Sequence, residues 1–155
     1  MSKSRIVVGV DESAGARAAF DWAAEQARLH GATLVPVRAY QVMSGSLPHA
    51  SVEEPFSKDL LAGSEHEAKQ AAETFLEGLA THVPDGVAVE PVVARGRPAH
   101  ELLRQAENAD MLVVGSRGRG GFAGLLLGSV SQQVVQHAHC PVVVIPPPAA
   151  AERGA

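Results

Sequence analysis

The chain has 155 residues, enough for one domain with a sizeable core, and 46% of them are hydrophobic while only 4% are aromatic. Its formal net charge of −4 argues against nucleic acid or an anionic membrane as a general partner. A single cysteine, Cys140, excludes an internal disulfide framework. We see no leader and no apolar run of membrane-spanning length, so we expect a cytoplasmic protein.

Signals for strands and helices alternate along the chain. Residues 5–10 are apolar and β-branched without alternation, as in a central parallel strand that is covered on both faces. Ser13 is a suitable N-cap for a helix that begins near Ala16, and Gly31 predicts its end. The same patterns predict a strand over 32–37, a surface loop over 40–55, a helix over 56–82, a strand over 87–93, a helix that starts at 96–98, a strand over 111–114, a helix over 130–138 and a strand over 142–145.

This alternation predicts a single doubly wound α/β domain with a five-stranded parallel sheet and helices on both faces. The crossovers between its strands are expected to be right-handed. Residues 1–146 form the predicted domain, and residues 147–155, which follow a run of prolines, form a predicted flexible tail.

A glycine-rich loop, Gly115 to Gly128, separates the fourth predicted strand from the last predicted helix. Glycines let backbone N–H groups turn inward and approach a ligand, and successive N–H groups form an anion-binding nest. The following helix start adds unpaired N–H groups, together with the hydroxyls of Ser129 and Ser131. Arg117 and Arg119 add positive charge, so the loop predicts a phosphate site.

The glycine spacing follows the pattern G-x2-G-x9-G-[ST], with its fixed positions at Gly115, Gly118, Gly128 and Ser129. With this pattern the chain resembles the universal stress protein family, in its ATP-binding branch. Residues 6–13 resemble the first strand and turn of the family, and residues 139–146 resemble its last strand. The resemblance therefore covers nearly the whole chain.

The resemblance implies the strand order 3-2-1-4-5, in which the loops after the first and fourth strands splay apart and leave a crevice. It implies ATP as the ligand, with Mg²⁺ as an ion that could accompany the phosphates. Asp11 matches an acidic residue of the family, Gly9 and Val10 would line the adenine end, and Val37 would pack on the base. The candidate site residues are Gly9, Val10, Asp11, Val37, Val114, Gly115, Arg117, Gly118, Gly128, Ser129, Val130 and Ser131. The resemblance also implies a homodimer through the last strand, residues 142–145, whose edge would otherwise be exposed.

Other motifs are weaker. Residues 118–123 fit a loose dinucleotide pattern, G-x-G-x-x-A, but no further βα unit and no acidic residue about twenty positions later follow them. No lysine precedes Ser129, which excludes a Walker loop. His137 and His139 are two positions apart and would point to different faces of a helix, which disfavours a metal site. Cys140 is expected to be a small buried residue at the start of the last strand, and a redox role is the weaker alternative.

These patterns predict an ATP-binding protein of the universal stress type that acts as a nucleotide-responsive regulator or sensor and not as an enzyme. The sequence shows no nucleophile–base pair and no carboxylate cluster. The alternative from another class is a slow ATP hydrolase or phosphotransferase on the same fold. A third hypothesis, an interaction module that has lost its ligand, is disfavoured by the intact glycine spacing.

Overall fold

A computed structural model describes residues 2–42, 54–118 and 126–149, with the backbone alone described for residues 54–63. Most of the predicted loop over 40–55, most of the predicted tail and Arg119 lie outside these ranges. The elements are, in chain order, β1 (Arg5–Gly9), α1 (Ala14–His30), β2 (Thr33–Tyr40), α2 (Glu54–Ala80), β3 (Val92–Arg95), α3 (Pro98–Gln105), a short 3-10 helix η1 (Ala106–Asn108), β4 (Met111–Gly115), α4 (Ser129–His137) and β5 (Val142–Ile145).

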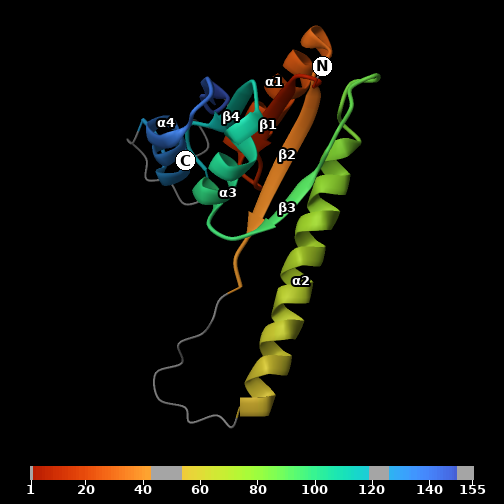
Figure 1. Ribbon diagram of the computed structural model, residues 1–155, viewed down its shortest axis with the longest axis vertical. Coiled ribbons are helices and arrows are strands. Elements are labelled where there is room, and N and C mark those ends of the chain that lie inside the picture. Colours follow the sequence, from red (N-terminus) through yellow and green to blue (C-terminus); the bar gives the residue numbers. More distant parts are fainter. Residues whose placement is uncertain (1, 43–53, 119–125, 150–155) are drawn as a thin grey trace.

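The five strands form one parallel sheet in the order β3-β2-β1-β4-β5, which confirms the predicted topology (Figure 1). Strand β1 is central, and its Val7 pairs with Val35 of β2 on one side and with Leu112 of β4 on the other. From β1 the sheet grows to one side through β2 and β3 and to the other side through β4 and β5, so the order of strands reverses between β1 and β4. The loops that follow these two strands therefore start side by side and lead to different parts of the sheet.

Both faces of the sheet are buried, as the apolar run of β1 predicts. One core joins the sheet to α1 and α2 and contains Val8, Phe20, Leu34, Leu76 and Val113. The other core joins it to α3 and α4 and contains Val7, Val37, Leu102, Leu112 and Val134. Successive residues of one strand thus pack into opposite cores, because side chains alternate between the two faces of a strand.

Local signals fix the helix ends where the sequence predicts them. The Ser13 hydroxyl accepts a hydrogen bond of 3.1 Å from the Ala16 N–H, which caps the start of α1. Gly31 follows the end of this helix with a left-handed φ of 62°, a conformation that favours glycine. Pro98 occupies the first turn of α3, where its missing N–H costs no helical hydrogen bond.

The third strand differs from the prediction over 87–93. The Leu34 N–H donates to the Ala88 carbonyl and the Glu90 N–H donates to the Leu34 carbonyl, both at 2.8 Å, so the earlier part of this segment makes only an isolated bridge to β2. Pro91 then interrupts the pairing, because proline has no N–H to donate. Continuous pairing starts at Val92 and extends to Arg95, two residues beyond the predicted end.

Helix α2 is the longest element, and its first turns extend well beyond the carboxyl edge of the sheet (Figure 1). Its later part packs on the core, through Ala72, Leu76 and Leu79. Ala71, which precedes Ala72 on this helix, is exposed. No helix in the described ranges has both the length and the apolar character needed to cross a membrane.

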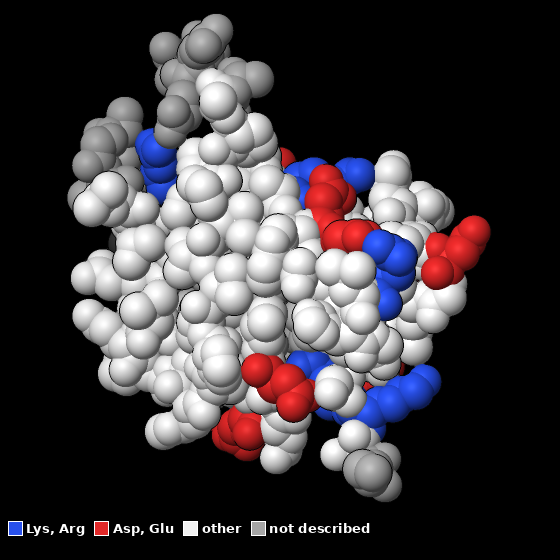
Figure 2. Space-filling model, turned by 90° about the horizontal axis from the view of Figure 1, so that it is seen from above, with Lys and Arg blue, Asp and Glu red and all other residues white. Residues whose placement is uncertain are grey.

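An ion pair and a hydrogen bond join elements at the amino edge of the sheet. The Arg5 guanidinium lies 2.6 Å from a Glu90 carboxylate oxygen, and the Arg5 N–H donates to Asp110 Oδ2 at 2.8 Å. On the face seen in Figure 2, acidic and basic side chains lie next to one another and most of the surface is uncharged. That face offers no broad basic patch of the kind that nucleic acid requires.

Candidate functional site

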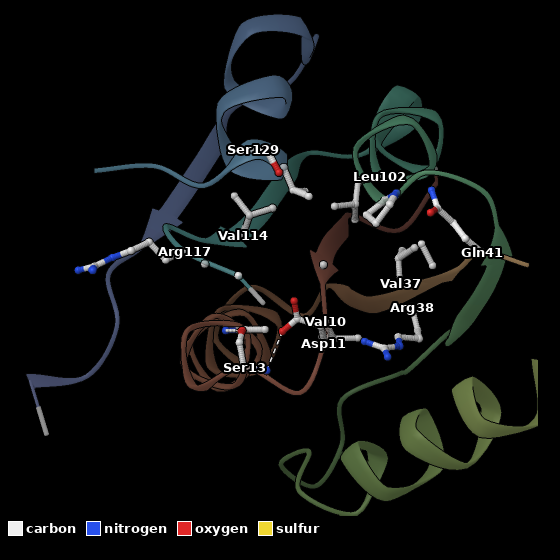
Figure 3. A pocket seen from close by; sticks show the side chains of 17 residues that line it. Val10, Asp11, Ser13, Val37, Arg38, Gln41, Leu102, Val114, Arg117 and Ser129 are labelled. Carbon is white, nitrogen blue, oxygen red and sulfur yellow. Dashed lines mark hydrogen bonds between the residues drawn. The ribbon is translucent and has the colours of Figure 1, made fainter. Parts of the chain in front are cut away.

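A cavity of about 320 Å³ opens at the carboxyl edge of the sheet, between the ends of β1 and β4 (Figure 3). Ten of the twelve predicted site residues line it: Gly9, Val10, Asp11, Val37, Val114, Gly115, Arg117, Gly118, Ser129 and Val130. The other lining residues, which the sequence analysis did not place at the site, are Ser13, Ala16, Arg38, Ala39, Gln41, Pro98 and Leu102. The fold therefore brings together segments from both halves of the chain.

The loop after β1 is held by a short turn. Asp11 Oδ1 accepts a hydrogen bond of 2.7 Å from the Ser13 N–H, and Ser13 in turn caps α1. The second carboxylate oxygen of Asp11 faces the glycine-rich loop, since a Cβ built on Gly118 would lie 3.3 Å from it. One oxygen of Asp11 thus fixes the turn, and the other is directed to the cavity (Figure 3).

Two glycines allow the loops after β1 and β4 to pack backbone against backbone. A Cβ on Gly115 would lie 2.8 Å from the carbonyl carbon of Gly15, and a Cβ on Gly15 would lie 2.7 Å from the Arg117 carbonyl oxygen. Real side chains do not tolerate such distances to backbone atoms, so both positions need glycine for close approach.

The two ends of the glycine-rich loop are joined by hydrogen bonds at the Ser116 carbonyl. This oxygen accepts the Gly128 N–H at 2.6 Å and also lies 2.9 Å from the Ser131 hydroxyl. The Ser131 hydroxyl is 3.0 Å from the Gly128 carbonyl as well, and the residue is 3% exposed. Gly128 and Ser131 are the two predicted residues that do not line the cavity. Their hydrogen bonds instead hold the two ends of the loop together.

The opposite end of the cavity is apolar and is covered by α3. Leu102 belongs to the core under this helix and also reaches the cavity, where Gly9 leaves room for it, because a Cβ on Gly9 would lie 2.8 Å from Leu102 Cδ1. The sequence holds no local signal for this second role of Leu102. Ala39 and Gln41 were missed because the second strand was predicted to end at Val37 and instead continues to Tyr40.

The end of β2 also presents backbone groups to the cavity. The Val37 carbonyl accepts the Val10 N–H on the β1 side, whereas the Tyr40 carbonyl accepts the Gly96 N–H on the β3 side. Because successive peptide groups of a strand alternate in direction, those of Ala39 point to the β1 side. Strand β1 has already ended at Gly9, so the Ala39 N–H and carbonyl face the cavity that Ala39 lines.

Arg38 is the cationic residue at this apolar end. Its Nη2 lies 2.6 Å from Glu12 Oε1, and its guanidinium carbon lies 5.1 Å from the centre of the Phe75 ring of α2. Arg117, half-buried, lines the other end, and its guanidinium points away from the cavity (Figure 3). The cavity thus runs from an apolar end, past a carboxylate, to a helix start that carries a hydroxyl.

The weaker motifs of the sequence gather no further chemistry. Within residues 2–42, 54–118 and 126–149 no three His, Cys, Asp or Glu side chains come together in a group that could hold a metal ion. His137 ends α4, and Cys140 precedes β5 in a half-buried position. Burial raises the pKa of the Cys140 thiol, and the charge of Asp110 acts in the same direction.

Comparison with known proteins places this geometry in a family. A model of the universal stress protein family matches residues 3–146. A universal stress protein of Mycobacterium tuberculosis (strain H37Rv) is 35% identical over 139 residues, which cover 90% of this chain and 44% of that protein. A universal stress protein of Thermus aquaticus is 36% identical over 143 residues, 90% of this chain and 96% of its own length. The chain spans less than half the length of the mycobacterial relatives that it matches.

Solved structures agree with the sequence comparison. Universal stress protein UspA from Lactobacillus plantarum is 28% identical with a TM-score of 0.70, covering 94% of this chain and 99% of its own. A universal stress protein whose crystal structure was determined in complex with cAMP is 26% identical with a TM-score of 0.61, covering 96% of this chain and all of its own. The chain therefore belongs to the universal stress protein family.

Proposed function

We propose that this chain binds ATP in the cavity between the ends of β1 and β4 and acts as a nucleotide-responsive regulator. The observation that carries the proposal is the order of groups along the cavity. Val37 and Leu102 form an apolar end, Asp11 lies in the middle, and Ser129 and Arg117 lie at the other end (Figure 3). This order matches the base, ribose and phosphates of a nucleotide.

Each part of a nucleotide finds a suitable partner. The N–H and carbonyl of Ala39 face the cavity and suit the paired donor and acceptor on the edge of adenine. The Asp11 oxygen that is directed to the cavity can accept hydrogen bonds from ribose hydroxyls. The start of α4, with the Ser129 hydroxyl, suits phosphate oxygens, and Mg²⁺ could accompany them.

The related structure solved with cAMP supports an adenine nucleotide as the ligand class. The choice of a triphosphate rests on the length of the glycine-rich loop and on its cationic residues. Among the described residues that line the cavity, Asp11 is the sole carboxylate and no lysine is present. Because phosphoryl transfer relies on metal-holding carboxylates and cationic clamps, a binding and regulatory role fits better than rapid turnover.

Titration calorimetry with ATP, AMP, cAMP and adenosine tests the proposal. We expect ATP to bind more tightly than adenosine, because the phosphates add contacts at the α4 end. Hydrolysis of bound ATP should remain far below the roughly 10 per second that is typical of enzymes. Absence of binding by all four ligands would refute the proposal, and turnover near the enzymatic value would favour the hydrolase alternative instead.

A further inference from the structure

Arg38 lines the cavity, yet none of the nucleotide contacts proposed above involves it. Its side chain is only 16% exposed, although it ends in a charged guanidinium. Two neighbours hold that group: the Glu12 carboxylate at 2.6 Å and the face of the Phe75 ring at 5.1 Å. A guanidinium that is both ion-paired and stacked on an aromatic ring has little freedom to move.

The partner of Arg38 lies in the loop that positions Asp11. Three consecutive residues of this loop are each anchored by a different contact: Asp11 accepts the Ser13 N–H, Glu12 pairs with Arg38, and Ser13 accepts the Ala16 N–H. The first and third contacts lie within the loop and the start of α1. The contact of Glu12 with Arg38 ties the loop to a neighbouring strand, 26 residues away in sequence.

We propose that Arg38 is a positioning residue for ribose recognition. By holding Glu12, it fixes the loop in the conformation that directs the second Asp11 oxygen to the cavity. Phe75 in turn fixes the guanidinium, so that α2 supports the site through Arg38. The inference rests on the proposed function, because it assigns Asp11 to the ribose hydroxyls of a bound nucleotide. A preformed loop binds more tightly than one that must be ordered when the ligand arrives.

The ratio of affinities for ATP and 2′,3′-dideoxy-ATP isolates this role, since the second ligand lacks the hydroxyls that Asp11 would bind. The parent protein should prefer ATP about tenfold or more, the usual size for a hydrogen bond to a charged group. Arg38→Leu should bring the ratio toward one by weakening ATP far more than dideoxy-ATP. Arg38→Lys, which keeps a cation opposite Glu12, should restore much of the ratio.

Two further variants make the test specific. Glu12→Gln removes the same ion pair from a half-exposed position, so it tests the inference even if Arg38→Leu fails to fold, and it should lower the ratio in the same direction. Arg95→Leu is the matched control: Arg95 ends the neighbouring strand β3 and pairs with Glu65 of α2 at 3.1 Å, but it does not line the cavity. This control should leave the ratio unchanged.

The outcomes separate this inference from the proposed function. If the parent protein binds neither nucleotide, the proposed function fails. If the parent binds both equally, or if Arg38→Leu and Glu12→Gln weaken both nucleotides by the same factor or not at all, Arg38 does not position the ribose contact and the inference is overturned.

Discussion

At the scale of single residues, the contact between Gly15 and Gly115 sets how closely the two loops of the site approach. A methyl group on Gly115 would lie 2.8 Å from the Gly15 carbonyl carbon and 2.9 Å from its oxygen, so one backbone must move. We expect Gly115→Ala to lower the free energy of unfolding by about 1–3 kcal/mol, as overpacked positions do. Nucleotide affinity should fall with it, because both loops line the cavity.

Urea denaturation and nucleotide titration would measure these two effects. Gly78→Ala is the matched control, because Gly78 lies in helix α2 and a Cβ there would meet nothing within 4 Å. It should raise stability by about 0.5–1 kcal/mol, since alanine loses less backbone freedom than glycine in a helix. A Gly115→Ala variant as stable as the parent would show that the loops yield easily.

Ser129 and Ser131, two positions apart at the start of α4, should separate binding from stability. Ser131→Ala removes the hydroxyl that joins the Ser116 and Gly128 carbonyls, and we expect it to cost about 1 kcal/mol of stability. Ser129→Ala removes an exposed, cavity-lining hydroxyl, so ATP affinity should fall while stability stays within about 0.5 kcal/mol.

Thermal unfolding and calorimetry on both serine variants check this separation. Ser131→Thr, which keeps a hydroxyl, should retain more of the parent stability than Ser131→Ala. If Ser131→Ala loses ATP binding and keeps full stability, Ser131 contacts the ligand directly and its hydrogen bonds to the loop carbonyls are secondary.

Cys140 should alkylate slowly, because burial raises the pKa of its thiol and the thiolate is the reactive form. In a series of pH values, the midpoint of iodoacetamide modification should be higher for the folded protein than for the same protein in urea. The sign for stability follows from this shift. Stability from the neutral thiol is complete below the pKa of the unfolded chain and is lost as the pH rises through the folded pKa. Equal midpoints in buffer and in urea would contradict the expectation.

At the scale of elements, the third strand shows where sequence patterns stop being decisive. The alternation from Val87 to Val93 is real, and Ala88 and Glu90 do bond to β2 through Leu34. Pro91 breaks the ladder within this segment, and the paired strand then runs on to Arg95. The paired strand could lie before or after the proline, and the register of pairing with β2 decides between the two. The sequence of this one segment does not specify that register.

Strand β5 should form the interface of a homodimer. The Pro141 carbonyl accepts a hydrogen bond from Leu112 of β4, and the Ile145 carbonyl accepts one from Ser116, directly after β4. The alternate peptide groups, those of Val142 and Val144, therefore point to the free edge. Val144→Pro removes one outward N–H without touching the hydrogen bonds to β4, and it should yield a folded monomer.

Light scattering at micromolar concentration would measure the mass of this variant and of the parent protein. Val144→Ala is the control, because it shortens the same side chain but keeps the N–H, and it should remain dimeric. A parent protein that is monomeric under these conditions would remove the basis for assigning β5 to an interface.

At the scale of the whole molecule, the alternation of strands and helices predicted a parallel sheet. The strand order, which the family resemblance implied, then placed Asp11 beside the glycine-rich loop. Sequence reasoning missed residues that line the cavity but belong to elements whose sequence pattern indicates only a structural role. Leu102 serves the core under α3, and Arg38 follows the predicted end of its strand by one position. Neither residue has a local sequence pattern that indicates a place at the cavity, because that role arises only when a distant segment packs next to it.

The parallel sheet gives the molecule a direction that is useful in practice. Every strand enters at the edge held by Arg5 and Asp110 and leaves at the edge that carries the cavity. The Ile145 carbonyl accepts the Ser116 N–H, so the exposed Pro146 emerges next to the glycine-rich loop. A dye attached through a cysteine at position 146 would therefore report on ligand binding, while an anchor to a surface at the exposed Ser4 would hold the molecule from its far side.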